Sequence, residues 1–207
     1  DVVAYAAENG ITVIPEIELP GHAVAALTSY PWLGCKGEGY EVRRRWGISK
    51  EVFCPGKETT FEFLQNVFAE VLELFPSEFI HIGGDECPTT QWENNELCKA
   101  RYKELKLTNY RQLQSHFIKE MADFVQSKGK KLAVWNESIT AAGADLNLIK
   151  QTDALVYCWQ PARQSAVKAK ELGLKNIYTP WGPYYINRRQ GNSPQDPPGA
   201  GYGTDDV

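Results

Sequence analysis

The amino-acid sequence predicts an α/β domain built on a parallel sheet, either a (β/α) barrel or a doubly wound sheet. Five short apolar, β-rich runs alternate with helical patterns along the 207 residues. Polar and aromatic side chains gather at the carboxyl end of each run, while the other ends are plain. Both kinds of parallel sheet build their binding face at that edge, so the same asymmetry predicts where the functional residues lie.

The predicted strands cover residues 11–17, 79–83, 131–135, 154–159 and 176–180. The second run has the apolar character of a strand buried on both faces. In chain order, the polar and aromatic residues at the strand ends are Glu16, Glu18 and His22; Asp85 and Glu86; Trp135, Asn136 and Glu137; Trp159 and Gln160; and Trp181. We interpret these ends as one edge of the sheet.

Two long helices are predicted from apolar residues spaced by three and four positions. The first follows a cap at Thr59 or Thr60 and separates the first two strands. The second begins at an Asn109 cap and ends at Gly129. The lone methionine, Met121, falls in the apolar stripe of the second helix, so we expect it in the core and not at a cofactor.

The predicted elements do not complete a closed barrel. Pro161 is expected in the first turn of a helix over residues 162–172 that Gly173 closes. Residues 1–10 resemble the tail of an amphipathic helix with a Gly10 cap, so we expect the chain to begin within a domain. Five strands are too few for an eight-stranded barrel, which suggests an internal part of a larger domain.

Composition is that of an ordinary globular protein, with 43% hydrophobic and 23% charged residues. No apolar run approaches the length of a membrane-spanning helix. A formal net charge of -4 with scattered basic residues makes nucleic acid an unexpected partner. Aromatic residues make up 12% of the chain, which suits stacking against sugar rings as well as it suits a core.

The five cysteines allow two interpretations. They lack the close CxxC pairs typical of zinc sites, so no sulfur-bound metal is expected. Cys35 and Cys54 bracket a polar, glycine-rich segment and are candidates for a disulfide, which would fit an exported protein. Reduced, buried thiols in a cytoplasmic enzyme are the alternative that the cysteine count leaves open.

Residues 79–86 are the most informative stretch, because an apolar run reaches Gly83 and Gly84 and then stops at Asp85 and Glu86. The glycines remove side-chain bulk where a backbone or ligand comes close. Carboxylates just past a buried parallel strand hold the position of catalytic groups in barrel enzymes. The glycines lead into acids, not into a phosphate loop, so a nucleotide site is disfavoured.

Three motifs, in order and in spacing, resemble the catalytic barrel of the family 20 glycoside hydrolases, the β-N-acetylhexosaminidases. Residues 81–86 are similar to the signature at the end of that family's fourth strand, residues 14–22 to its third-strand motif, and residues 135–137 to the Trp-x-Glu of its fifth. The resemblance implies a (β/α)8 TIM barrel in which residues 1–207, as a single partial domain, cover strands three to seven. By themselves these residues are expected to show little activity.

The resemblance implies a hydrolase that removes terminal β-linked N-acetylglucosamine or N-acetylgalactosamine with retention and without a cofactor. Adjacent strand-end carboxylates diverge and do not flank a scissile bond, and in this family the substrate's own acetamide oxygen is the nucleophile. The matched positions make Glu86 the general acid and base. Asp85 would orient the acetamide and stabilise the oxazolinium-like intermediate, and His22 would hydrogen-bond toward the acid.

The sugar-binding residues are also implied by the resemblance. Trp135 and Trp159 would wall the pocket for the acetamide methyl and the sugar face. Tyr185 would donate to the acetamide oxygen, with Tyr184 as the alternative. Asn187 stands where the family usually has an aspartate, so this chain keeps a hydrogen-bonding group there but loses its charge.

Two other classes of function are weighed against the hydrolase. A non-catalytic carbohydrate-binding barrel would have lost the acid, and Glu86 is present. A metal-dependent hydrolase using His22, His81 and Asp85 is disfavoured because no close histidine pair occurs on a strand; we interpret His81 as a core histidine. The expected partner is a glycan containing N-acetylhexosamine, the expected location is outside the cytoplasm, and the oligomeric state stays open.

Overall fold

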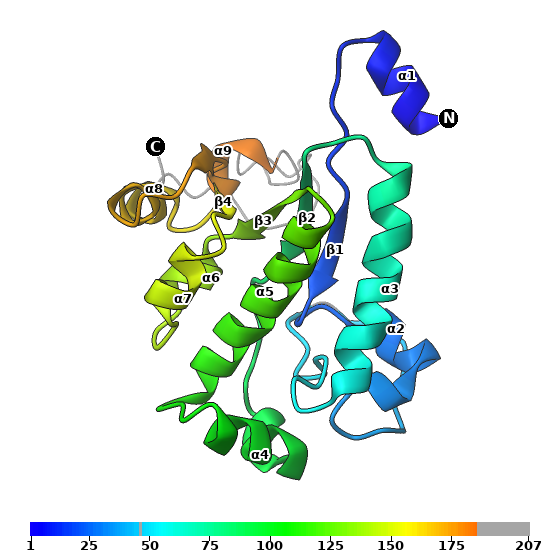
Figure 1. Cartoon of the computed structure of the whole chain (residues 1–207), viewed down its shortest axis with the longest axis vertical. Helices are drawn as coiled ribbons and strands as arrows, with labels where there is room; N and C mark the ends of the chain where they lie inside the picture. Colours follow the sequence, from blue (N-terminus) through cyan, green and yellow to red (C-terminus); the bar gives the residue numbers. More distant parts are fainter. Residues whose placement is uncertain (46, 186–207) are drawn as a thin grey trace, which may run out of the picture.

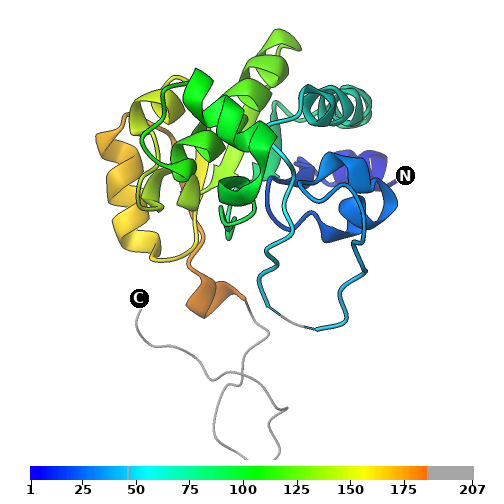
Figure 2. The same ribbon diagram turned by 90° about the horizontal axis from the view of Figure 1, so that it is seen from below.

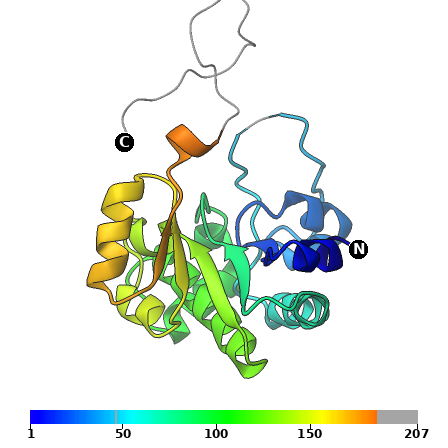
Figure 3. The same cartoon turned by 90° about the horizontal axis from the view of Figure 1, so that it is seen from above.

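The computed structural model describes residues 1–45 and 47–185 and contains a parallel sheet with strand order β1-β2-β3-β4-β5 (Figure 3). The strands are β1 (Glu16–Leu19), β2 (Phe79–Gly83), β3 (Lys131–Trp135), β4 (Leu155–Cys158) and β5 (Asn176–Tyr178). Each strand pairs with the next one in sequence. A doubly wound sheet reverses its strand order, so the observed order is that of a partial (β/α) barrel.

Helices connect the strands and lie around the sheet. They are α1 (Val2–Glu8), α2 (Val24–Ser29), α3 (Glu58–Leu74), α4 (Glu96–Glu104), α5 (Tyr110–Ser127), α6 (Glu137–Thr140), α7 (Leu146–Lys150), α8 (Ala162–Glu171) and α9 (Trp181–Tyr184), with 3-10 helices η1 (Pro31–Leu33) and η2 (Trp92–Asn94). Helices α3 and α5 run side by side (Figure 1), and α8 lies at the opposite end of the sheet from α3 (Figure 2). No helix in the described part of the chain is long and apolar enough to cross a membrane.

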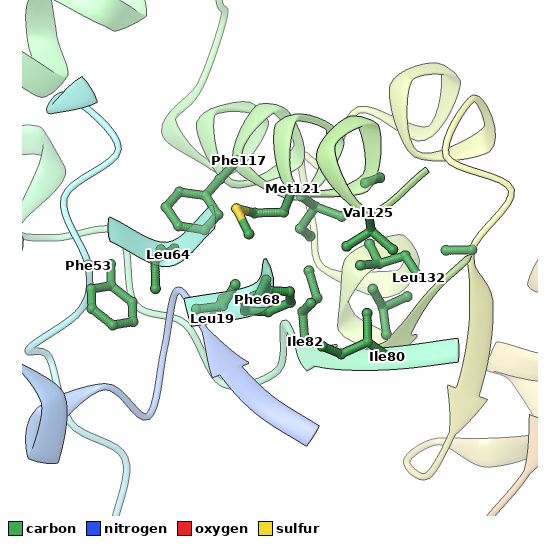
Figure 4. Packing of buried hydrophobic residues seen from close by; sticks show 14 of the residues in the cluster. Leu19, Phe53, Leu64, Phe68, Ile80, Ile82, Phe117, Met121, Val125 and Leu132 are labelled. Carbon is green, nitrogen blue, oxygen red and sulfur yellow. The ribbon is translucent and has the colours of Figure 1, made fainter. Parts of the chain in front are cut away.

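The main core fills the space between one face of the sheet and helices α3 and α5 (Figure 4). Ile80 and Ile82 of β2 point into this core and are fully buried beside Phe68 of α3 and Met121 of α5. Because side chains alternate along a strand, His81 and Gly83 face the other way. The sheet therefore has an apolar face that packs against helices and a second face that carries polar side chains.

Helix α3 begins earlier than the sequence predicts. Lys57 is its N-cap and Glu58 its first residue. Thr60 lies inside the first turn, where its buried hydroxyl donates to the Leu33 carbonyl at 3.1 Å. The predicted cap at Thr59 or Thr60 is therefore wrong, since the Thr60 hydroxyl holds the helix against η1 instead of capping it.

The limits of α5 are as predicted. The Asn109 side chain accepts the Gln112 N–H at 3.1 Å, and Gly129 follows the helix with a φ of +74°. Pro161 is the N-cap of α8 and not a residue of its first turn, and Gly173 closes that helix with a φ of +76°. Strand β1 starts later than the predicted residue 11. Its pairing with β2 begins where Glu16 lies opposite His81.

The cysteines do not form the expected disulfide. All five have free thiols in the structure. The sulfur atoms of Cys35, Cys54 and Cys98 nevertheless lie within 4.8 Å of one another. The spacing of cysteines along the chain did not predict this trio, because it forms where three separate segments meet.

Candidate active site

The ends of β1 and β2 bring His22, Asp85 and Glu86 together. Nε2 of His22 lies 3.3 Å from Asp85 Oδ2 and 3.4 Å from Glu86 Oε2. The hydrogen bond to Asp85 is the main cause of a raised pKa at His22, and the negative charges of both carboxylates add to it. His22 and Glu86 both have left-handed backbones, with φ of 48° and 43°, an uncommon conformation that costs energy outside glycine.

Asp85 and Glu86 do not diverge as predicted, since both reach His22. Adjacent side chains point apart only while the strand stays extended. The left-handed Glu86 lies outside that geometry, and both carboxylates reach the same imidazole nitrogen. The two acids therefore lie on one side of the site, with no room between them for a sugar ring.

Glu18 is a buried acid beside Asp85 that the sequence analysis left without a role. Burial, followed by the negative charge of Asp85, raises the pKa of Glu18 to about 9, so this carboxyl holds a proton at neutral pH. A protonated Glu18 removes one negative charge from the surroundings of Asp85. Gly83 has a φ of +71°, and a Cβ there would overlap the Glu18 carboxyl, so glycine provides the space for it.

Helix α5 holds the backbone on both sides of the two acids. Gln114 Nε2 donates to the Gly84 carbonyl at 2.9 Å, and Arg111 Nη1 donates to the Cys87 carbonyl at 2.8 Å. Arg111 also donates to Gln114 Oε1, which orients the amide. Gln114 is buried, with 2% of its surface exposed. A buried glutamine in the apolar stripe of α5 is the signal that sequence reasoning missed.

The two tryptophans that are predicted to wall the sugar pocket donate hydrogen bonds from their indole nitrogens to acids at the same edge of the sheet. Trp135 Nε1 donates to Glu16 Oε1 at 2.8 Å. Trp159 Nε1 donates to both oxygens of Glu137, at 3.0 and 2.9 Å. Burial raises the pKa of Glu137 to about 7. These bonds fix the planes of both rings.

Tyr185 extends the aromatic wall. Its ring stacks on Trp159 with centroids 6.2 Å apart and an interplanar angle of 8°, and Trp159 meets Trp135 edge to face at 6.3 Å. Tyr184 is 63% exposed, against 44% for Tyr185, so the packing favours Tyr185 as the residue beside the tryptophans. Asn187 lies outside the described residues.

Asn136 ties the ends of β3 and β4 together, a role that the sequence analysis did not assign. It is fully buried, its Oδ1 accepts the Trp159 N–H at 2.8 Å, and its Nδ2 donates to the Gln160 carbonyl at 2.9 Å. A satisfied, buried amide of this kind fixes the spacing between two strand ends. Asn136 therefore holds the Trp159 backbone where Glu137 holds its ring.

His81 lies inside the sheet, with its Nδ1 3.3 Å from Glu16 Oε1, and is not in contact with Glu86. It is 3% exposed, its Nδ1 accepts the Gly83 N–H at 3.0 Å, and it packs between the rings of Trp135 and Tyr157. Burial lowers its pKa to about 4, so the ring is neutral. Among the described residues the possible hard-ligand group is His22, Asp85 and Glu86, so His81 does not join the other two members of the disfavoured metal set.

A partial barrel with paired acids and an aromatic wall at the carboxyl ends of its strands has the layout of an enzyme barrel domain. Residues 1–206 match the family model for the catalytic domain of glycosyl hydrolase family 20. The chain therefore belongs to glycosyl hydrolase family 20, as the three motifs imply.

Relatives of known name agree with this membership. The chain is 38% identical over 202 residues to a β-hexosaminidase of Porphyromonas gingivalis, with 97% of this chain and 25% of the relative covered. It is 35% identical to a β-hexosaminidase of Vibrio furnissii, covering 95% of this chain and 31% of that one. The chain thus spans between a quarter and a third of the length of these two relatives.

Solved structures show the same fold. A β-N-acetylhexosaminidase from Bacteroides fragilis superimposes with a TM-score of 0.79 at 34% identity, covering 94% of this chain and 38% of that chain. An exo β-N-acetylglucosaminidase from Vibrio harveyi, solved in complex with N-acetylglucosamine, gives a TM-score of 0.81 at 31% identity, covering 97% and 30%. Both likenesses extend over almost all of this chain.

Proposed function

We propose that the protein carrying these residues is a glycoside hydrolase that removes terminal β-linked N-acetylglucosamine or N-acetylgalactosamine with retention of configuration. The observation that carries this proposal is the contact of Asp85 and Glu86 with one nitrogen of His22, at 3.3 and 3.4 Å. Glycosidases that use two opposed carboxyls place them roughly 5 to 9.5 Å apart across the scissile bond. Two acids on the same side of the site require a nucleophile from elsewhere.

The substrate supplies that nucleophile. Its acetamide oxygen forms the bond to the anomeric carbon while Glu86 protonates the departing glycosidic oxygen, which gives an oxazolinium-like intermediate. Asp85 accepts the acetamide N–H and stabilises the positive charge. Glu86 then takes a proton from the water that attacks the anomeric carbon and opens the oxazolinium ring. His22, hydrogen-bonded to Asp85 and 3.4 Å from Glu86, positions both carboxylates.

The aromatic wall and the tyrosine complete the proposed pocket. Trp135 and Trp159 pack against the acetamide methyl and the sugar face, and Tyr185 donates to the acetamide oxygen. The stacking of Tyr185 on Trp159 supports this placement. Asn187 is proposed to bind a sugar hydroxyl. A protonated Glu18 beside Asp85 leaves one carboxylate charge for the developing cation.

Substrate assistance is tested by comparing an aryl β-N-acetylglucosaminide with the corresponding aryl β-glucoside, using the full-length gene product. We expect turnover of the first and almost none of the second, which lacks the acetamide. Asp85→Asn should lower kcat on the first substrate, and nuclear magnetic resonance should show the β-anomer as the first product. Equal turnover of both glycosides, or an α-anomeric first product, would rule out the mechanism.

A carbohydrate-binding barrel without catalysis is separated from the hydrolase by ligand affinity. A thiazoline that mimics the cyclised intermediate should bind much more tightly than N-acetylglucosamine, because the site stabilises that intermediate. Calorimetry on the full-length gene product measures both. Equal affinities would favour the binding module.

Export from the cytoplasm stays a prediction. The free thiols of Cys35 and Cys54 remove one of its supports, because the expected disulfide was an argument for an oxidising compartment. Amino-terminal sequencing of the full-length gene product from its native cells tests it. A processed signal sequence would support export, and an unprocessed terminus in the cytoplasmic fraction would contradict it.

A further inference from the structure

Three cysteines that the proposed reaction does not use lie together beside the active-site loops. The sulfur of Cys98 lies 3.5 Å from that of Cys54 and 3.9 Å from that of Cys35, and all three sulfurs lie within 4.8 Å of one another. Thiolates at about 2.3 Å from a tetrahedral zinc ion are roughly 3.8 Å apart. A disulfide joins only two sulfurs at about 2.05 Å, so the spacing of the trio is that of ligands around one ion.

Backbone pairing sets the first two thiols side by side. Gly34 and Phe53 form an antiparallel bridge, and the Cys54 N–H donates to the Leu33 carbonyl at 2.9 Å. Cys35 and Cys54 each follow a residue of this bridge directly. Two ligands therefore come from a paired backbone, which holds their separation independently of any ion.

The third thiol comes from the first turn of α4. Asn95 caps this helix, and its Oδ1 accepts the N–H groups of Leu97 and Cys98 at 3.1 Å each. A Cβ on Gly56 would overlap the backbone of Leu97 and Cys98, so a glycine two residues after Cys54 lets the segments approach closely. The cap and the glycine together place Cys98 against the other two thiols.

The trio is closed on one side and open on the other. Cys54 and Cys98 are fully buried in a small second core that also contains Trp92. Cys35 is half-buried and lines a cavity of about 460 Å³ together with Asn95. The Asn95 Oδ1 already accepts two backbone N–H bonds, so a water from the cavity is the natural fourth ligand.

We propose that Cys35, Cys54 and Cys98 bind one zinc ion through three thiolates, with water as the fourth ligand. Thiolate-rich tetrahedral sites select zinc over hard divalent ions, and binding releases the thiol protons. Lys57 lies next to the site, its Nζ donating to the Trp32 and Gly34 carbonyls at 2.8 Å, and offsets the excess negative charge of three thiolates.

The proposed ion links the loops that carry the acids without touching them. Cys35 belongs to the loop after β1, which also carries His22, and α4 follows the loop after β2 that carries Glu86. Cys87, which follows Glu86 directly, packs in the same second core as Cys54 and Cys98. The zinc site is therefore expected to stabilise the position of these loops.

Metal analysis of the full-length gene product, purified with reductant and without chelator, tests the proposal. We expect about one zinc per chain, and replacement by cobalt should give the near-ultraviolet charge-transfer band of thiolate ligands. Cys54→Ser and Cys98→Ser should each lose the metal and lower the melting temperature. Cys158→Ser is the matched control that keeps it, because that thiol is equally buried but lies in β4.

A second control separates the trio from the acids. His22→Gln should keep the zinc, because His22 belongs to the other possible ligand group. Metal content and the cobalt spectrum are read without substrate, so their outcome is independent of the proposed hydrolase activity. The proposal is overturned by wild-type protein with substoichiometric zinc, by a mapped disulfide within the trio, or by metal lost in His22→Gln and kept in Cys54→Ser.

Discussion

One face of the five-stranded sheet is apolar and the other is polar, although both belong to the same hydrogen-bonded strands. The face toward α3 and α5 is closed by fully buried apolar side chains such as Ile80, Ile82 and Leu132. The other face carries acids, and there Glu18 keeps its proton beside Asp85, while His81 Nε2 is buried without a hydrogen-bond partner among the described residues.

Unpartnered buried polar atoms are costly, so they persist where they serve something other than folding. The apolar face packs against helices, and we expect the polar face to contact the substrate of the proposed reaction. We therefore expect stability and activity of the full-length gene product to respond to different substitutions in one sheet.

Glu86→Gln should lower kcat/KM on an aryl β-N-acetylglucosaminide by about 10²- to 10⁴-fold, since it removes the general acid. The side chain is 28% exposed, so the melting temperature should stay unchanged. Steady-state kinetics and thermal unfolding measure the two quantities. Near-native turnover would contradict the assignment of Glu86.

Phe68→Ala should lower stability and leave kcat unchanged. Phe68 is fully buried in the apolar core, and truncation to alanine in such sites costs about 3–5 kcal/mol. Denaturant unfolding measures the loss, and kcat at a temperature where the variant is folded should match the wild type. Ile80→Val, at about 0.5–1.5 kcal/mol, is the milder control if Phe68→Ala does not fold. A kcat defect in Ile80→Val would break the comparison.

Gly83→Ala tests the crowding on the polar face. Gly83 and Gly129 have similar backbones, with φ of +71° and +74°, but only Gly83 has an atom within 4 Å of an added Cβ. Gly129→Ala should cost about 1–2 kcal/mol from the left-handed backbone alone. Gly83→Ala should cost clearly more and also reduce kcat, because it displaces Glu18. An equal loss of unfolding free energy in the two variants would show that the Glu18 side chain moves aside without a penalty.

Glu18→Gln tests the protonation of the buried acid through pH. The pKa of Glu18 is raised from 4.5 to about 9, so between these values the folded state keeps a proton that the unfolded state releases. Wild-type stability therefore falls as pH rises through this window, and the glutamine variant lacks that loss. The variant should gain stability relative to the wild type between pH 5 and pH 8. If the unfolding free energies of the wild type and of Glu18→Gln change with pH in parallel, Glu18 is ionised in the folded state.

The alternation of strands and helices, the bounds of β2, β3 and α5, and the edge at which the acids lie were all predictable from the sequence. These features are local, because periodicity, a cap and a strand end are written in consecutive residues. The three motifs also sufficed for the family, since their order and spacing depend on the chain alone. Asp85 and Glu86 were found in this way.

The meeting of separate segments could not be predicted in this way. The strand order excluded a doubly wound sheet. The carbonyls of Gly84 and Cys87 accept hydrogen bonds from Gln114 and Arg111 of α5. Three cysteines that are distant in the sequence lie with their sulfurs within 4.8 Å of one another. The raised pKa of Glu18 likewise depends on burial and on the neighbouring Asp85 charge, which no spacing along the chain encodes. Contacts of this kind depend on long-range packing, and therefore appear only once the fold has brought the strand ends together.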